Sequence, residues 1–142
     1  LPTAVAEFYA AVGPRGVGIP TPQGVDFWFP PLAELWALQA ECGADAWPES
    51  WLVLAECDDD TLVVDGRTGE CHLLRDGVAG PRGSVDQLVA ALADIGELTE
   101  EAGDDRLGDD FELNPQWARS ARRAIMTQHG ETGGAVWDFV AD

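Results

Sequence analysis

Three short apolar runs in the middle of the chain constrain its fold more than any other feature of the sequence. They are residues 51–56, 61–65 and 70–74. Each is rich in β-branched or other apolar side chains, as strands are. Between them lie three aspartates at residues 58–60 and two glycines within residues 66–69. Aspartate bonds to nearby backbone and glycine adopts positive φ, so both segments reverse the chain. The pattern predicts an antiparallel meander around residues 51–75.

Apolar residues recur at helical spacing before and after this meander. The predicted helices are residues 3–12 with Thr3 as N-cap, a second between Pro31 and Gly43, residues 84–92, and a fourth that follows Asn114-Pro115. The second should turn a stripe of Leu32, Leu35, Trp36 and Gln39 toward the core, and the third opens with a capping box at Ser84. Together these elements predict an α+β fold with a central antiparallel sheet and helices packed on it.

The remaining segments carry weaker signals. Residues 25–29 favour a brief strand, and residues 76–83 favour a loop because they are rich in glycine. Half of residues 97–112 are acidic, which indicates a loop or linker. Residues 133–140 fit a strand or a helical turn equally well. We therefore expect a single domain over residues 1–142, in which residues 97–142 form an acidic segment and a C-terminal helical extension.

Charge is the strongest global signal. The chain has 26 acidic residues against eight basic ones, a net charge of −18. Such a field repels nucleic acid and anionic membranes and speeds encounter with basic proteins. Solubility, or a source organism rich in acidic residues, explains the same charge. Since no apolar run approaches the length of a membrane span and no basic leader precedes one, we expect a cytoplasmic protein with neither a nucleic-acid nor a membrane partner.

No motif in the sequence predicts catalysis. Asp58, Asp59 and Asp60 could attract a hard cation, but consecutive carboxylates converge poorly and a solvated turn is the stronger interpretation. Neither His72 nor His129 accompanies a recognisable nucleophile motif, and no phosphate-binding loop is present. We therefore expect no enzyme activity, no metal and no cofactor.

The cysteines and the arginines of the fourth helix both have structural explanations. The three cysteines, at positions 42, 57 and 71, form no C-x-x-C pair, so we expect small buried residues rather than a zinc site. Arg119, Arg122 and Arg123 share one side of the fourth helix, and we expect them to pair with the acidic segment at residues 97–112.

The order of these elements resembles the SUKH superfamily of yeast cell-wall regulators and bacterial immunity proteins. The matching features are an opening Leu-Pro before an amphipathic helix, an aromatic segment before a second helix, a Trp before an apolar strand, an acidic turn, a strand ending in Asp, and a Thr-Gly hairpin. They stand here at residues 1–9, 27–32, 51–55, 58–60, 62–65 and 68–69. The resemblance covers about residues 1–95. Residues 13–16 depart from the glycine-rich turn of the family, and the chain beyond Glu97 has no counterpart.

The resemblance implies an immunity protein that binds and blocks a toxin, and a basic nuclease would suit the charge of this chain. The alternative is a regulatory or scaffolding module without a toxin partner. On either hypothesis we expect exposed acids and one aromatic residue to make the contacts. These residues are Asp58, Asp59, Asp60, Glu100, Glu101, Asp104, Asp105 and Trp28.

Overall fold

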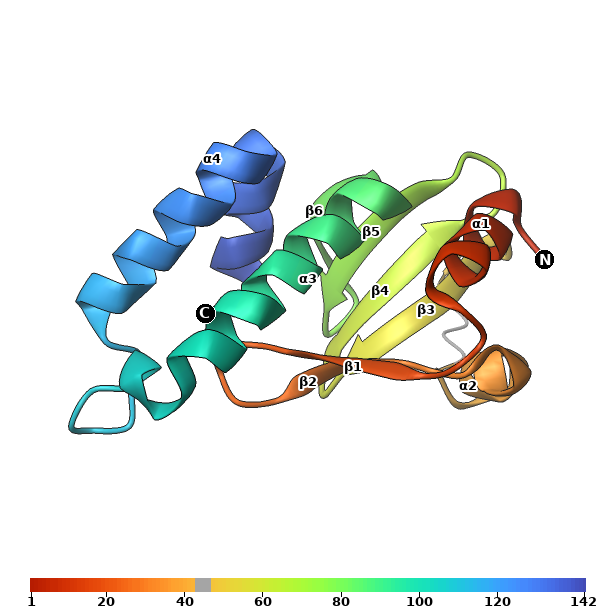
Figure 1. Cartoon of the computed structure of the whole chain (residues 1–142). Helices are drawn as coiled ribbons and strands as arrows, with labels where there is room; N and C mark the ends of the chain where they lie inside the picture. The colour runs from red at the N-terminus through yellow and green to blue at the C-terminus, as the bar shows by residue number, and fades with distance from the viewer. Residues whose placement is uncertain (43–46) are drawn as a thin grey trace. The chain divides into compact units, whose positions relative to one another are not determined.

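The computed structural model describes residues 1–42 and 47–142. The chain divides into two compact units (Figure 1). The first unit contains residues 1–18 and 27–86, and the second contains residues 19–26 and 87–142.

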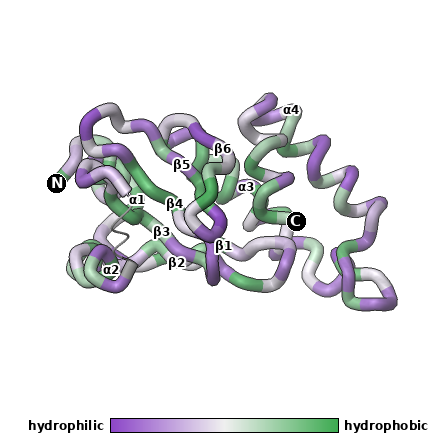
Figure 2. Tube along the Cα trace, turned by 180° about the vertical axis from the view of Figure 1, so that it is seen from behind, coloured by the Kyte–Doolittle hydropathy of each residue, from purple (hydrophilic) through white to green (hydrophobic). Residues whose placement is uncertain are grey.

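A six-stranded sheet, with its strands in chain order, belongs to the first unit except for residues 19–20 and 26. The strands are β1 (Val17–Pro20), β2 (Asp26–Phe29), β3 (Trp51–Cys57), β4 (Asp60–Asp65), β5 (Glu70–Arg75) and β6 (Val78–Ser84). The pairs from β2 to β6 are antiparallel. Figure 2 shows the apolar residues along the central strands. The predicted α+β fold with its meander is confirmed.

The strand β6 corrects the loop predicted for residues 76–83. Asp76 and Gly77 both have positive φ, and they form a two-residue turn that sends the chain straight back along β5. Pro81 and two glycines are poor strand formers. They are tolerated because β6 lies at the edge of the sheet, where Pro81 need not donate to a further strand.

Helix α1 (Thr3–Val12) buries one face in the first unit. The ring of Phe8 stacks on Phe29, with centroids 5.4 Å apart, and the Tyr9 hydroxyl donates to the carbonyl of Pro30 at 2.7 Å. The predicted cap differs, because the helix already includes Thr3 and no side chain caps its start. It ends as predicted at Gly13, whose φ is 86°.

Helix α2 (Leu35–Cys42) follows a short 3-10 turn, η1 (Leu32–Glu34), and packs against β3. Leu38 belongs to a cluster with Val53, Val63 and Leu74. The Gln39 amide donates to the Val53 carbonyl and accepts from the Val53 N–H, both at 2.7 Å. Because the register of β3 with β4 shifts between Val53 and Ala55, Gln39 bonds the backbone next to a β-bulge.

The second unit is mostly helical. It contains α3 (Val85–Ala102) from Gln87 onward, the 3-10 turn η2 (Gly103–Arg106) and α4 (Pro115–Val140). Helix α3 begins directly after Ser84, as predicted, but extends ten residues beyond the predicted end at Leu92. The loop predicted for residues 97–112 is therefore wrong as far as Arg106, and it correctly describes only the segment that follows.

Helix α4 reverses direction at Gly130, whose φ of 65° and ψ of −150° are not helical. Its two halves form a hairpin in which the rings of Trp117 and Trp137 lie 5.8 Å apart. A Cβ at Gly133 would lie 2.9 Å from the Ile125 carbonyl oxygen, so glycine permits the close approach. Asn114 caps the helix start as predicted. Of the two predicted states for residues 133–140, helix is the one observed.

Candidate protein-binding surface

Two tryptophans stand out because they lie on the outside of the first unit. Trp28 keeps 44% of its surface exposed and Trp36 keeps 60%, and Leu32 is also exposed. Large apolar side chains on a protein surface are unremarkable singly, but a group of them marks a contact site. We call Gly16, Trp28, Pro31, Leu32 and Trp36 the aromatic surface.

Strand β2 directs Trp28 outward because alternate residues of a strand face opposite sides. Its ring lies over Gly16 and beside Pro31. A Cβ built on Gly16 would lie 2.8 Å from the Trp28 ring and 2.9 Å from the Pro31 ring. Such contacts are too short for any side chain, so glycine at this position lets the indole lie flat against the backbone. Trp28 is therefore held in place by its neighbours although it remains exposed.

Leu32 and Trp36 extend this surface from the strand onto the helix. Leu32 opens the 3-10 turn η1 and Trp36 lies in the first turn of α2, and both side chains are exposed. The Leu32 N–H donates to the Pro14 carbonyl at 2.9 Å, which ties the start of η1 to the loop that contains Gly16. This backbone hydrogen bond keeps Leu32 near Trp28 and Pro31.

The predicted inward stripe on the second helix is wrong at Leu32 and Trp36. Leu35 and Leu38 are buried instead. The chain enters this helix through η1, and a 3-10 turn has three residues per turn instead of 3.6, so the inward face is displaced. Trp36 is thus the exposed aromatic residue that the sequence analysis missed. The spacing of Leu35 and Leu38 by three residues was the sequence signal that could have indicated the buried face.

The structure brings Trp28 close to two predicted acids. Trp28 pairs with Glu56 across β2 and β3. Asp58 follows two residues later, about 7 Å further along the strand direction. Asp58 and Asp59 form the exposed two-residue turn to β4, and the Asp76 N–H donates to the Asp59 carbonyl at 3.0 Å. Two hairpin turns with three exposed carboxylates therefore lie at the same end of the sheet.

Asp60 does not belong to this exposed group, contrary to prediction. It is buried, and its two carboxylate oxygens accept from the Arg75 guanidinium at 2.9 and 3.1 Å. The pair joins β4 to β5 at the positions that face each other in the ladder. Asp60 thus stabilises the hairpin end that displays Asp58 and Asp59.

The other predicted contact residues lie in the second unit. Glu100 and Glu101 are exposed in the last turn of α3, and Asp104 and Asp105 are exposed in η2. Arg106 turns back from this acidic stretch and donates to the carbonyls of Pro22 and Gly103, at 3.0 and 2.8 Å. These four acids form a second acidic group.

The chemically reactive side chains are occupied in structural contacts. His72 stacks on Trp51 and lies 3.2 Å from Glu70, while His129 pairs with Asp94. Burial raises the pKa of the Cys71 thiol to about 12, so it stays protonated at neutral pH. Cys57 is also buried, and the side chain of Cys42 lies outside the described residues. No three His, Cys, Asp or Glu side chains within residues 1–42 and 47–142 gather as metal ligands do.

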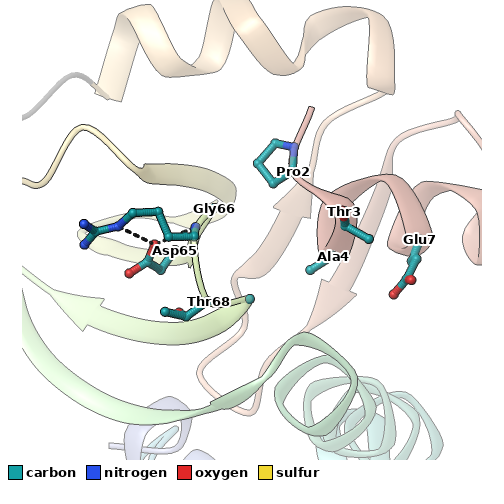
Figure 3. A pocket seen from close by; sticks show the side chains of 9 residues that line it. Pro2, Thr3, Ala4, Glu7, Asp65, Gly66 and Thr68 are labelled. Carbon is teal, nitrogen blue, oxygen red and sulfur yellow. Dashed lines mark hydrogen bonds and ion pairs between the residues drawn. The ribbon is translucent and has the colours of Figure 1, made fainter.

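A pocket of about 290 Å³ lies between the start of α1 and the turn from β4 to β5 (Figure 3). Asp65 accepts from the Arg67 N–H at 2.9 Å, and this hydrogen bond holds the Asp65 pKa below its ordinary value. Glu7 and Arg67 also line the pocket. Because the pocket is lined by charges of both signs and by no aromatic residue, the aromatic surface is the stronger candidate for contact with a partner.

Comparisons of the chain with protein-family models, with characterised proteins and with solved structures found no match. No helix within the described residues is long and apolar enough to cross a membrane.

Proposed function

We propose that this chain is a protein-binding domain that recognises a basic protein through the aromatic surface and the acidic turns beside it. The observation that carries the proposal is the exposure of Trp28 and Trp36, the two exposed aromatic side chains among the described residues of the first unit, whose phenylalanines and tyrosine are buried. Interface energy concentrates in a few aromatic anchors, and Trp is the residue most enriched among them.

Acidic residues near Trp28 and Trp36 add an electrostatic contribution to binding. Asp58 and Asp59 lie just beyond the strand position that faces Trp28, and Glu34 is exposed between Leu32 and Trp36 in the helix. An apolar centre with a charged rim is the usual anatomy of an interface. On a chain of net charge −18, these acids favour a partner of positive charge and raise the rate of association.

We propose further that the partner is a toxin, as in the SUKH-type immunity proteins that the sequence resembles. A nuclease needs a basic surface to hold its anionic substrate. An acidic protein that covers this surface would exclude the substrate by occupying the same charges. Inhibition would thus need no catalytic group on the inhibitor, and localisation in the cytoplasm would place it where a nuclease acts.

The test is affinity capture from the source cell with the purified chain as bait. Parallel baits carry Trp28→Ser with Trp36→Ser, or Asp58→Asn with Asp59→Asn. A matched control carries Val78→Ser, since Val78 is an exposed apolar residue of β6 that lies outside the aromatic surface. We expect a basic protein that is retained by the wild type and the control, lost with the double Trp variant and weakened with the double Asn variant.

The captured protein is then assayed with and without the bait. Loss of its nuclease activity in the presence of wild-type chain would support the immunity role. Retention of a cell-wall or signalling assembly, with no inhibited activity, would support the scaffolding role in its place. Equal retention by all four baits would contradict the assignment of the aromatic surface.

A further inference from the structure

A basic groove on the second unit contrasts with the charge of the whole chain. It is an open surface pocket of about 460 Å³ along the first half of α4. We call it the arginine groove, and its lining residues are Arg119, Arg122, Arg123, Met126 and Thr127. From Pro115 to Gly130 the sequence contains these three arginines and no acid. A volume of several hundred Å³ is typical of sites that accept a ligand or a side chain.

Among the described residues, only one of the three arginines has an acidic partner. Arg122 forms a bidentate ion pair with Asp138, with hydrogen bonds of 2.8 and 3.0 Å. This ion pair raises the Arg122 pKa and lowers the Asp138 pKa. Within residues 1–42 and 47–142, Arg119 and Arg123 make no ion pair, although acids outnumber basic residues threefold. The predicted pairing of these arginines with residues 97–112 is therefore wrong.

The same unit presents a complementary projection, the acidic loop at residues 107–113. Its ends pair through Leu107 and Leu113, and the Gly108 N–H donates to the Glu112 carbonyl at 2.7 Å. At its tip Phe111 is 84% exposed, with a positive φ of 63° that is rare for an aromatic residue. Exposed acids flank it: Asp109, Asp110 and Glu112. The loop thus offers one apolar ring surrounded by three carboxylates.

The acidic loop does not reach the groove of its own chain. It is fixed at its base because the Asn114 N–H donates to the Arg106 carbonyl at 2.7 Å, directly before α4 begins. None of its carboxylates pairs with an arginine of the groove in the described chain. Each copy therefore keeps both a basic groove, in which the Met126 sulfur accepts from Arg122 at 2.9 Å, and an acidic loop with an apolar tip, and the two do not meet within the described chain.

We propose that the acidic loop of one copy of this chain docks into the arginine groove of a second copy. Arg119 and Arg123, four residues apart on one helical face, would hold the carboxylates that flank Phe111, and the Phe111 ring would lie on Met126. A thioether against an aromatic ring is a favourable contact. The contact joins unlike surfaces, so two of them related by a two-fold axis close a dimer, whereas one alone leaves an open chain.

Salt dependence distinguishes this contact from general charge effects. Two copies of charge −18 repel one another at low salt. At about 0.15 M salt the Debye length is about 8 Å, so repulsion between distant charges is screened while ion pairs in contact persist. At about 1 M salt the pairs weaken as well. We therefore expect self-association to pass through a maximum at intermediate salt.

The experiment is sedimentation velocity on the full chain at these salt concentrations, with protein up to about 0.1 mM. A groove variant carries Arg119→Glu and Arg123→Glu. A loop variant carries Phe111→Ser, Asp109→Asn and Asp110→Asn. The control carries Arg15→Glu and Arg82→Glu, which change the net charge as the groove variant does but lie on the first unit at exposed positions. Circular dichroism checks that each variant is folded.

We expect the wild type and the control to associate, and the groove and loop variants each to be weakened about tenfold or more. An equimolar mixture of the two variants should associate more strongly than either variant alone, because one of the two contacts of the dimer is then intact. A wild type that stays monomeric at every salt concentration would overturn the proposal. So would association that both variants leave unchanged, or folded variants whose mixture associates no more strongly than either variant alone.

Discussion

The two faces of β2 use the same kind of residue for opposite purposes. Phe27 and Phe29 are buried almost completely, whereas Trp28 between them keeps 44% of its surface exposed. The next helix repeats the contrast, with Leu35 buried and Trp36 exposed. Burial of an aromatic ring contributes to the free energy of folding, and an exposed ring contributes little until a partner covers it. The comparison teaches that apolar character alone does not assign a residue to the core.

The largest expected effect is on the buried face. Phe29→Ala removes a ring that stacks on Phe8, and it should lower the free energy of unfolding by about 3–5 kcal/mol, because the transfer free energy is lost and a cavity remains. Urea denaturation at constant m-value measures the change. A loss below about 1 kcal/mol would mean that this face of β2 is not part of a close-packed core.

The hairpin end offers the same contrast among carboxylates. Asp60→Ala removes both acceptors of the Arg75 guanidinium from a buried position, and should cost about 1–2 kcal/mol of unfolding free energy. Asp59→Ala, at an exposed turn position, should cost less than about 0.5 kcal/mol. Thermal denaturation of the two variants measures the difference. Equal losses would contradict the structural role of Asp60.

The buried thiol of Cys71 on β5 makes the stability of the chain depend on pH. Cys71 is buried and its folded-state pKa is raised to about 12 from 9.0, so the thiol ionises more readily in the unfolded chain. The contribution of the protonated Cys71 thiol to the free energy of unfolding is complete below pH 9 and falls as the pH rises from 9 towards 12. We expect a loss of about 1 kcal/mol between pH 8 and pH 10. Cys71→Ala should remove that pH dependence, and a loss that persists in this variant would assign it to other groups.

The smallest expected change in stability is on the exposed face. Trp36→Ser alters a side chain that is 60% exposed, so the free energy of unfolding should change by no more than about 0.5 kcal/mol. The same denaturation measurement as for Phe29→Ala gives the comparison directly. A loss of several kcal/mol would show that Trp36 packs in the core, and the aromatic surface would then lose its main anchor.

The strands of the meander could be predicted because alternation and turn residues are local signals. Strand β6 could not, since Pro81 is acceptable only at a sheet edge, and edge position is a property of the whole sheet. The end of α3 was missed for a different reason. Glu97, Glu100 and Glu101 form the exposed face of a helix, whereas their composition alone suggested a linker. Glutamate is in fact a good helix former.

The candidate site was predicted only in part. Trp28, Asp58 and Asp59 could be named from the sequence as exposed contact residues, and the structure places all three at the surface. That they lie near one another depends on the pairing of Trp28 with Glu56, which no local pattern determines. Asp60 could not be separated from its two neighbours until the register of β4 with β5 placed it opposite Arg75.

The central claim is that the aromatic surface binds a basic protein, and isothermal titration of the captured partner tests it most directly. The titration compares the wild type with the Trp28→Ser, Trp36→Ser double variant, after both are shown to be equally stable. The account predicts a Kd at least about 30-fold weaker for the variant, equivalent to about 2 kcal/mol. An unchanged Kd would contradict it, because the partner would then bind elsewhere on the chain.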